Sequence, residues 1–137
     1  MTQTITRGIK SLLEDANKEI ETMSVADVKA AVERGDAVLV DLRDPRELER
    51  EGRIPGSFFC PRGMLEFWID PESPYAKPIF QENKKFIFHC ASGWRSALAA
   101  KSAQDMGLKP VAHLGGGYKA WRDAGEAIET VEPKAKA

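Results

Sequence analysis

Residues 86–95 read Phe-Ile-Phe-His-Cys-Ala-Ser-Gly-Trp-Arg, and two kinds of pattern meet within them. The first four are mostly aromatic or β-branched and predict a short buried strand. Small and apolar residues then recur at helical spacing from Ser96 to Met106, which predicts a helix that ends at Gly107. Cys90 therefore lies at a junction of strand, loop and helix.

The start of a helix suits a sulfur anion, because its first backbone N–H groups lack partners and the helix dipole is positive there. The guanidinium of Arg95 adds positive charge, and both effects favour the thiolate form of Cys90. Gly93 permits the tight backbone path of a cradle, and Ser92 offers a hydroxyl to an anion. Cys90 is therefore the candidate nucleophile.

This segment resembles the active-site loop of the rhodanese-like sulfurtransferases, in which Cys-x-x-Gly-x-Arg follows a central strand and the cysteine carries a persulfide. By this resemblance Cys90 is catalytic, and the loop that binds the anion consists of Ala91, Ser92, Gly93, Trp94 and Arg95. The related dual-specificity phosphatases and arsenate reductases have five residues between cysteine and arginine, a wider cradle for a tetrahedral oxyanion. This chain has four, which favours a single sulfur atom.

A second region, residues 41–57, resembles the rhodanese segment with Asp-x-Arg at a strand end, a charged helical turn and a Gly-His-Ile-Pro-Gly-Ala turn. Asp41 and Arg43 match the Asp-x-Arg and lie at the strand edge where open α/β sheets place ligands. The resemblance implies that they support the site and that Arg43 shapes its rim. A salt bridge that holds the turn is an equal alternative, and both roles can coexist. Arg53 and Ser57 stand where the family usually has histidine and alanine.

Residues 115–125 resemble a third rhodanese signature, a Gly-Gly turn followed by a helix that bears tryptophan and closes with Ala-Gly. We expect Trp121 to pack in the core. The turn does not indicate a nucleotide-phosphate loop, since neither Gly-x-Gly-x-x-Gly nor a Gly-Lys-Ser/Thr ending is present.

The remaining elements alternate as expected for βαβ units. Ser24 caps a helix that ends at Gly35, with Asp27 in a position like that of a capping box. Residues 37–42 are continuously apolar up to Asp41, as in a parallel sheet covered on both faces. Further strands are predicted at 20–23, 58–60 and 110–114, a helix at 63–69 and a Pro-rich loop at 70–83.

Residues 1–19 form a predicted helical extension, residues 20–130 the domain, and residues 131–137 a charged tail that we expect to be disordered. We expect the extension's helix to cap the domain in preference to binding a partner, because apolar stripes usually mark core faces. The stripe consists of Ile9, Leu12, Leu13 and Ala16.

Three further groups of side chains have competing interpretations. The charges from Arg43 to Arg53, four arginines and four acids, predict a solvated helix with i,i+4 pairs. His89 should point away from Cys90 on its strand and is a poor general base, whereas His113 stays open as a partner. Cys60 is expected to be a small buried hydrophobe, with a resolving thiol as the alternative.

The composition fits one domain, with 137 residues of which 42% are hydrophobic. The net charge of −1 gives no indication of a nucleic-acid partner. Two cysteines and two histidines are too few for a disulfide framework or a four-cysteine zinc site, so we expect no metal and no cofactor. Without an apolar leader or a run of 18 apolar residues, the chain is predicted to be cytoplasmic, with no membrane partner.

Together the three regions imply a rhodanese-like three-layer α/β fold, with a five-stranded parallel sheet and helices on both faces. They also imply that Cys90 takes sulfur from thiosulfate or a persulfide and passes it to cyanide or a thiol. A non-catalytic binding module, or a persulfide carrier that serves a protein partner, is one alternative. A cysteine-based phosphatase or arsenate reductase is the other.

Overall fold

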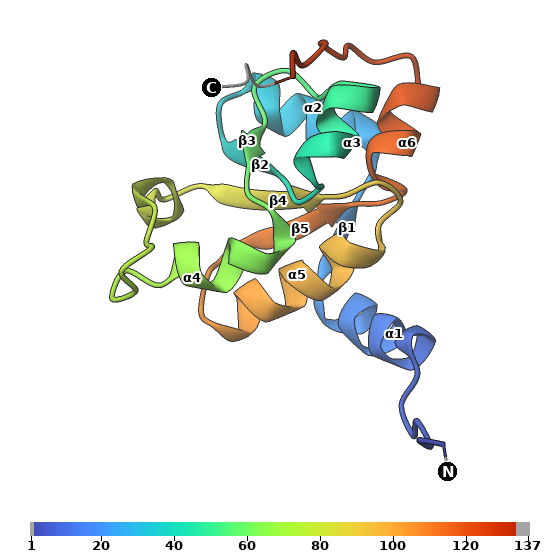
Figure 1. The fold of residues 1–137 in the computed structure, drawn as a ribbon. Helices are drawn as coiled ribbons and strands as arrows, with labels where there is room; N and C mark the ends of the chain where they lie inside the picture. Colours follow the sequence, from blue (N-terminus) through green and yellow to red (C-terminus); the bar gives the residue numbers. More distant parts are fainter. Residues whose placement is uncertain (1, 134–137) are drawn as a thin grey trace.

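A sheet of five parallel strands, in the order β1-β5-β4-β2-β3, forms the middle layer of the molecule (Figure 1). The computed structural model describes residues 2–133, so the end of the expected tail lies outside the described residues. The elements along the chain are α1 (Ile9–Glu19), β1 (Glu21–Met23), α2 (Val25–Glu33), β2 (Ala37–Asp41), α3 (Pro45–Glu51), β3 (Phe58–Phe59), the 3-10 helix η1 (Arg62–Met64), α4 (Leu65–Ile69), the 3-10 helix η2 (Pro78–Gln81), β4 (Lys85–His89), α5 (Trp94–Asp105), β5 (Val111–Leu114) and α6 (Gly117–Asp123).

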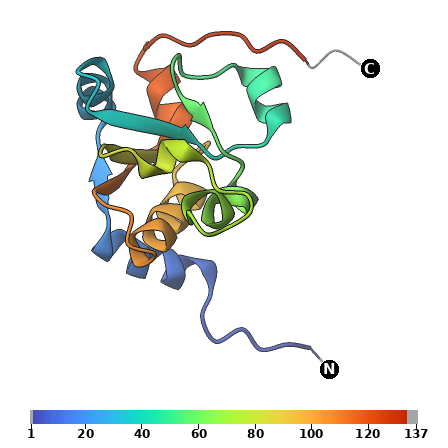
Figure 2. The same ribbon diagram turned by 90° about the vertical axis from the view of Figure 1, so that its left-hand side faces the viewer.

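Helices cover both faces of this sheet, so the predicted three-layer α/β fold is confirmed. Helices α1, α4 and α5 lie on one side, and α2, α3 and α6 on the other, as Figures 1 and 2 show from two directions. Strands β2, β4 and β5 send alternate residues into two separate cores, which is why β4 reads as a continuous apolar run. Phe86 and Phe88 belong to the core under α5, and Ile87 belongs to the core under α6.

Local signals in the sequence account for the starts of two helices. Ser24 caps α2 by accepting a hydrogen bond from the backbone N–H of Asp27 at 3.2 Å, as the sequence predicts. Asp44 and Glu47 form a complete capping box at α3, with Pro45 in its first turn. The expected loop at 70–83 is interrupted by η2, which buries Phe80.

The N-terminal helix α1 packs against α5. Of the four apolar positions that predicted it, only Leu13 and Ala16 are buried, whereas Ile9 and Leu12 are exposed. Among the described residues, no helix combines the length and the apolar character that a membrane crossing requires.

A buried ion pair between Arg43 and Asp41 lies at the C-terminal end of β2. Arg43 and Asp41 are 1% and 0% exposed, with 2.8 Å between Nη2 of the arginine and Oδ2 of the aspartate. Arg43 also donates to the carbonyl of Gly52 and lies 4.0 Å from the ring centroid of Tyr118. Burial by itself would raise the pKa of Asp41, but the hydrogen bonds from Arg43 hold it below its ordinary value. The predicted salt bridge is therefore present.

The two departures from the second motif contact each other. The guanidinium of Arg53 donates to the carbonyl and to the hydroxyl of Ser57, and that hydroxyl in turn donates to the carbonyl of Ile54 at 2.7 Å. Arg53 and Ser57 thus form one hydrogen-bonded turn between α3 and β3.

We predict that Arg43→Met destabilises the protein strongly, because the carboxylate of Asp41 is left buried without its partner. The expected loss in the free energy of unfolding is about 3–5 kcal/mol, measured by urea denaturation. Lys119→Ala is the matched control, since its pair with Asp123 is exposed. The prediction is wrong if the two variants unfold at the same urea concentration.

Candidate active site

Cys90 lies between the end of β4 and the start of α5, with its side chain buried at 1% exposure. Its Sγ accepts a hydrogen bond from the backbone N–H of Gly93 at 3.2 Å and lies 3.7 Å from the hydroxyl oxygen of Ser96. Gly93 has a φ of 110°, which only glycine adopts readily, and it lets the chain turn into α5 directly after the N–H that faces the sulfur. Gly93 and Ser96 thus both approach the Sγ of Cys90.

Arg95 is held by a residue that the sequence did not single out. Its Nη1 and Nη2 donate to the two carboxylate oxygens of Glu47 at 2.8 and 3.0 Å. The hydrogen bonds from Arg95 lower the pKa of Glu47 to about 2, so this carboxylate is charged at neutral pH. The interpretation of the charge run as a solvated helix is wrong for Glu47, which closes the capping box of α3 and braces the active-site loop.

Helix α6 fixes the outer side of the loop. The backbone N–H groups of Tyr118 and Lys119 donate to the carbonyls of Cys90 and Ala91 at 2.8 and 3.1 Å. These donors belong to the first turn of α6, where a helix leaves N–H groups without internal partners. A Cβ at Gly117 would lie 2.6 Å from the carbonyl oxygen of Cys90, so this close approach requires glycine.

Trp94 and Ser92 form the exposed part of the loop. Trp94 is 54% exposed at the first position of α5, and Ser92 is exposed beside it. Ala91 and Arg95 are half-buried. The five residues follow Cys90 directly in the chain, and the side chain of Trp94 is accessible from solvent.

Asp41 and Arg43 lie beneath the loop and not on an open rim, because both side chains are fully buried. Their position corrects the implied rim role of Arg43. His89 faces this pair, with Nε2 3.6 Å from Oδ2 of Asp41, while Nδ1 lies 3.4 Å from the backbone carbonyl of Cys90. Burial lowers the pKa of His89, so its imidazole is neutral at physiological pH. Its ring lies against Asp41 and Tyr118, on the α6 side of the sheet.

Cys60 is fully buried in the core that α4 and α5 share, which confirms the expectation of a buried hydrophobe. Burial raises the pKa of its thiol to about 12. A thiol of this kind is almost entirely protonated at neutral pH and is a poor resolving nucleophile.

A set of hydroxyl and imidazole groups on the α5 side of the sheet was not predicted as part of the site. Oγ of Ser96 lies 3.0 Å from Nδ1 of His113. Nε2 of the same imidazole lies 3.1 Å from Oγ1 of Thr22. The sequence left His113 open as a partner of the cysteine. Ser96 gave one signal, since it follows Arg95 directly and so falls in the first turn of α5.

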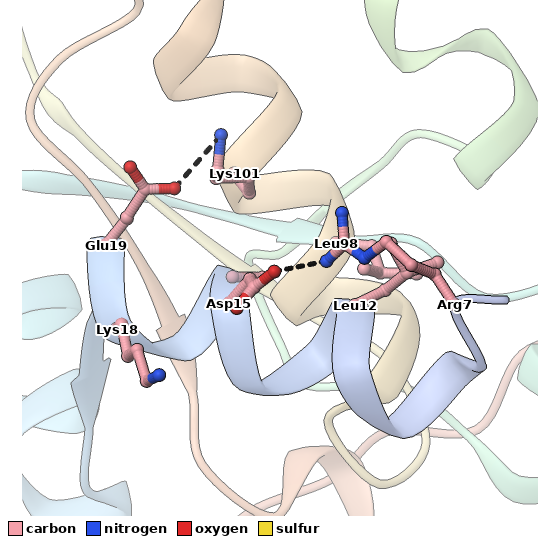
Figure 3. Close-up of a pocket in the computed structure, with 8 residues that line it drawn as sticks. Arg7, Leu12, Asp15, Lys18, Glu19, Leu98 and Lys101 are labelled. Atoms are coloured by element: carbon pink, nitrogen blue, oxygen red, sulfur yellow. Dashed lines mark hydrogen bonds and ion pairs between the residues drawn. The ribbon is translucent and has the colours of Figure 1, made fainter.

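An open groove lies elsewhere, between α1 and α5 (Figure 3). Its apolar floor includes Leu12 and Leu98, and its charged residues are largely paired, as in the 3.1 Å contact of Lys101 with Glu19. Its lining side chains include no cysteine, serine, threonine or histidine. Within residues 2–133, no group of three or more histidine, cysteine or acidic side chains is arranged to hold a metal ion.

The chain is similar to proteins of known structure and sequence. A Rhodopseudomonas palustris structure, of unknown function and described as a possible tyrosine phosphatase, is 70% identical, with a TM-score of 0.90 and coverage of 94% of this chain and 99% of that one. The human single-domain sulfurtransferase is 25% identical, with a TM-score of 0.64 and coverage of 74% and 95%. A thiosulfate sulfurtransferase of Pseudoalteromonas translucida is 28% identical over 74% of this chain and 89% of its own length.

The family model for the rhodanese-like domain matches residues 24–124, from the cap of α2 to the end of α6. This match includes the Cys90 loop, the Asp41–Arg43 pair and the turn at Gly117. The chain therefore belongs to the rhodanese-like domain family.

Proposed function

We propose that this protein is a sulfurtransferase that moves a sulfane sulfur from thiosulfate or a persulfide to a thiophilic acceptor, through a persulfide on Cys90. The observation that supports this best is the cradle itself, in which Gly93 and Ser96 converge on a single Sγ. Relatives named as sulfurtransferases support the same chemistry. We further propose a cytoplasmic location, where a free thiol stays reduced.

The reaction needs two displacements at sulfur. The Cys90 thiolate attacks the outer sulfur of thiosulfate, the sulfur–sulfur bond of the donor breaks, and sulfite leaves with the bonding electron pair. An acceptor thiolate or cyanide then attacks the outer sulfur of the persulfide. The Cys90 thiolate leaves, and the product carries the sulfur as a persulfide or as thiocyanate.

Three groups of this chain have distinct parts in the proposed reaction. The N–H of Gly93 and the hydroxyl of Ser96 stabilise negative charge on sulfur. Arg95 keeps the loop in place through Glu47 and adds positive potential beside Cys90. Its pKa is raised above the ordinary value, chiefly by the hydrogen bond to Glu47. Trp94 offers an exposed apolar wall to a small donor or acceptor.

A phosphatase is the alternative function to test, because the similar Rhodopseudomonas palustris structure is described as a possible tyrosine phosphatase. An arginine that binds phosphate offers its paired N–H groups to two oxygens. In this chain both terminal nitrogens of Arg95 already donate to Glu47, so they are not free to hold two phosphate oxygens in that way. With four residues between Cys90 and Arg95, the loop is also shorter than the phosphatase pattern.

We predict that incubation of the full chain with thiosulfate adds about 32 Da, the mass of one sulfur atom in a covalent intermediate. Intact-mass and peptide measurements should locate the adduct on Cys90, and an added thiol should remove it. Cys90→Ser should form no adduct.

Cys60→Ala is the matched control and should form the adduct as the wild type does, because Cys60 is buried and protonated. Absence of any adduct on Cys90 counts against the proposal. Release of phosphate from an aryl phosphate that Cys90→Ser abolishes would favour the phosphatase. An adduct that small thiols and cyanide discharge only slowly would favour a carrier that serves a protein partner.

We predict that Gly117→Ala slows formation of the persulfide by roughly tenfold to a hundredfold, because the new methyl group displaces the backbone of Cys90. Gly125→Ala is the control, since Gly125 also has a positive φ of 77° but its new methyl group would meet no atom within 4 Å. Mass spectrometry over time gives both rates. Equal rates for the two variants would mean that the contact of α6 with the loop does not matter for the reaction.

A further inference from the structure

Four side chains form a continuous series of contacts that starts at the reactive sulfur and ends at the surface. Sγ of Cys90 lies 3.7 Å from Oγ of Ser96, which lies 3.0 Å from Nδ1 of His113. Nε2 of His113 lies 3.1 Å from Oγ1 of Thr22. Cys90, Ser96 and His113 are buried at 1%, 0% and 4% exposure, whereas Thr22 is exposed.

The parallel sheet brings these residues together. Thr22 and His113 are direct partners in the register of β1 and β5, so their side chains lie on the same face. Val111, two residues before His113 on β5, belongs to the core under α5. His113 therefore points toward α5, where it meets Ser96 in the helix's first turn.

The series can be fully hydrogen-bonded in two directions. When Cys90 is a thiol, S–H donates to Ser96, the Ser96 hydroxyl donates to Nδ1 of His113, and Nε2–H donates to Thr22. When Cys90 is a thiolate, Thr22 donates to Nε2, Nδ1–H donates to Ser96, and the Ser96 hydroxyl donates to sulfur.

The two arrangements differ by one proton. Starting from the thiol, the sulfur proton passes to Ser96, the proton of Ser96 passes to Nδ1, and the proton on Nε2 passes to Thr22, which releases its own proton to solvent. The imidazole is neutral in both, and only its tautomer changes. Burial lowers the pKa of His113, which keeps the ring neutral at physiological pH as both arrangements require.

We propose that His113, oriented by Thr22, is a positioning residue that turns the Ser96 hydroxyl toward Cys90 and thereby stabilises the thiolate. This inference rests on the proposed function only in taking Cys90 as the reacting thiol. Without His113, the Ser96 hydroxyl has no N–H donor behind it and is free to turn away from the sulfur. The same contacts connect a buried thiol to solvent at Thr22.

The test measures the thiolate directly and needs no sulfur transfer. The rate at which iodoacetamide alkylates Cys90 is followed across pH in a Cys60→Ala background, and mass spectrometry confirms the modified residue. The midpoint of this profile reports formation of the thiolate. A failure of this test is thus separate from a failure of the persulfide measurement.

We expect His113→Leu and Ser96→Ala to move the midpoint to higher pH and to lower alkylation at neutral pH by roughly tenfold, the usual effect of one hydrogen bond to a charged group. His113→Asn keeps an N–H donor near the position of Nδ1 and should restore most of the wild-type profile. Thr22→Val should give a smaller shift in the same direction. Without the Thr22 hydroxyl, the proton of His113 is no longer favoured on Nδ1, but the ring stays in place beside Ser96.

A purely structural role for His113 would lower the free energy of unfolding, measured by urea denaturation, and leave the midpoint unchanged. An unchanged midpoint in folded His113→Leu would overturn the proposal, as would a His113→Asn profile as impaired as that of His113→Leu. If His113→Leu does not fold, the exposed Thr22→Val variant decides, and a wild-type midpoint there overturns the proposal.

Discussion

The Cys90 loop, residues 90–95, keeps its shape because the first turn of α6 binds its backbone. The N–H groups of Tyr118 and Lys119 have no partners within their helix, and the carbonyls of Cys90 and Ala91 satisfy them. In the same loop, the N–H of Gly93 faces the sulfur. Gly117 makes this approach possible, since any Cβ there would collide with the loop. The Gly-rich turn before α6 and the Cys90 loop are therefore joined by backbone hydrogen bonds into one unit.

Helix α3 stabilises the loop from another direction with a residue that has two uses. Glu47 accepts a hydrogen bond from the backbone N–H of Asp44, which closes a capping box. The same carboxylate accepts hydrogen bonds from both terminal nitrogens of Arg95. A shift of α3 would therefore move Arg95 as well. The buried pair of Asp41 and Arg43 holds the segment that leads into α3, and so acts on the loop through Glu47 without reaching the sulfur.

The two histidines show how the sheet divides the polar groups around Cys90. His89 points to the α6 side, where it lies against Asp41, and His113 points to the α5 side, where it contacts Ser96. Both imidazoles are buried and neutral. On the α5 side, Ser96 lies between His113 and Cys90 and so connects the imidazole to the sulfur. His113 is the partner of Phe88 in the register of β4 and β5. His89 is one position further along β4, so its side chain lies on the opposite face of the sheet.

The sequence alone determined the local features of this protein. The apolar run of β4, the cysteine before a helix, the cap at Ser24 and the glycines that permit positive φ are all encoded within a few residues, because strand, turn and capping preferences act over that range. Cys90 and its loop could be predicted for the same reason. The tertiary structure decided which distant residues support them. Glu47 meets Arg95 across 48 positions and Thr22 meets His113 across 91, and both contacts depend on where the chain's elements lie around the sheet. No local pattern specifies that β5 lies between β1 and β4, so the long-range contacts around the sulfur follow only from the fold.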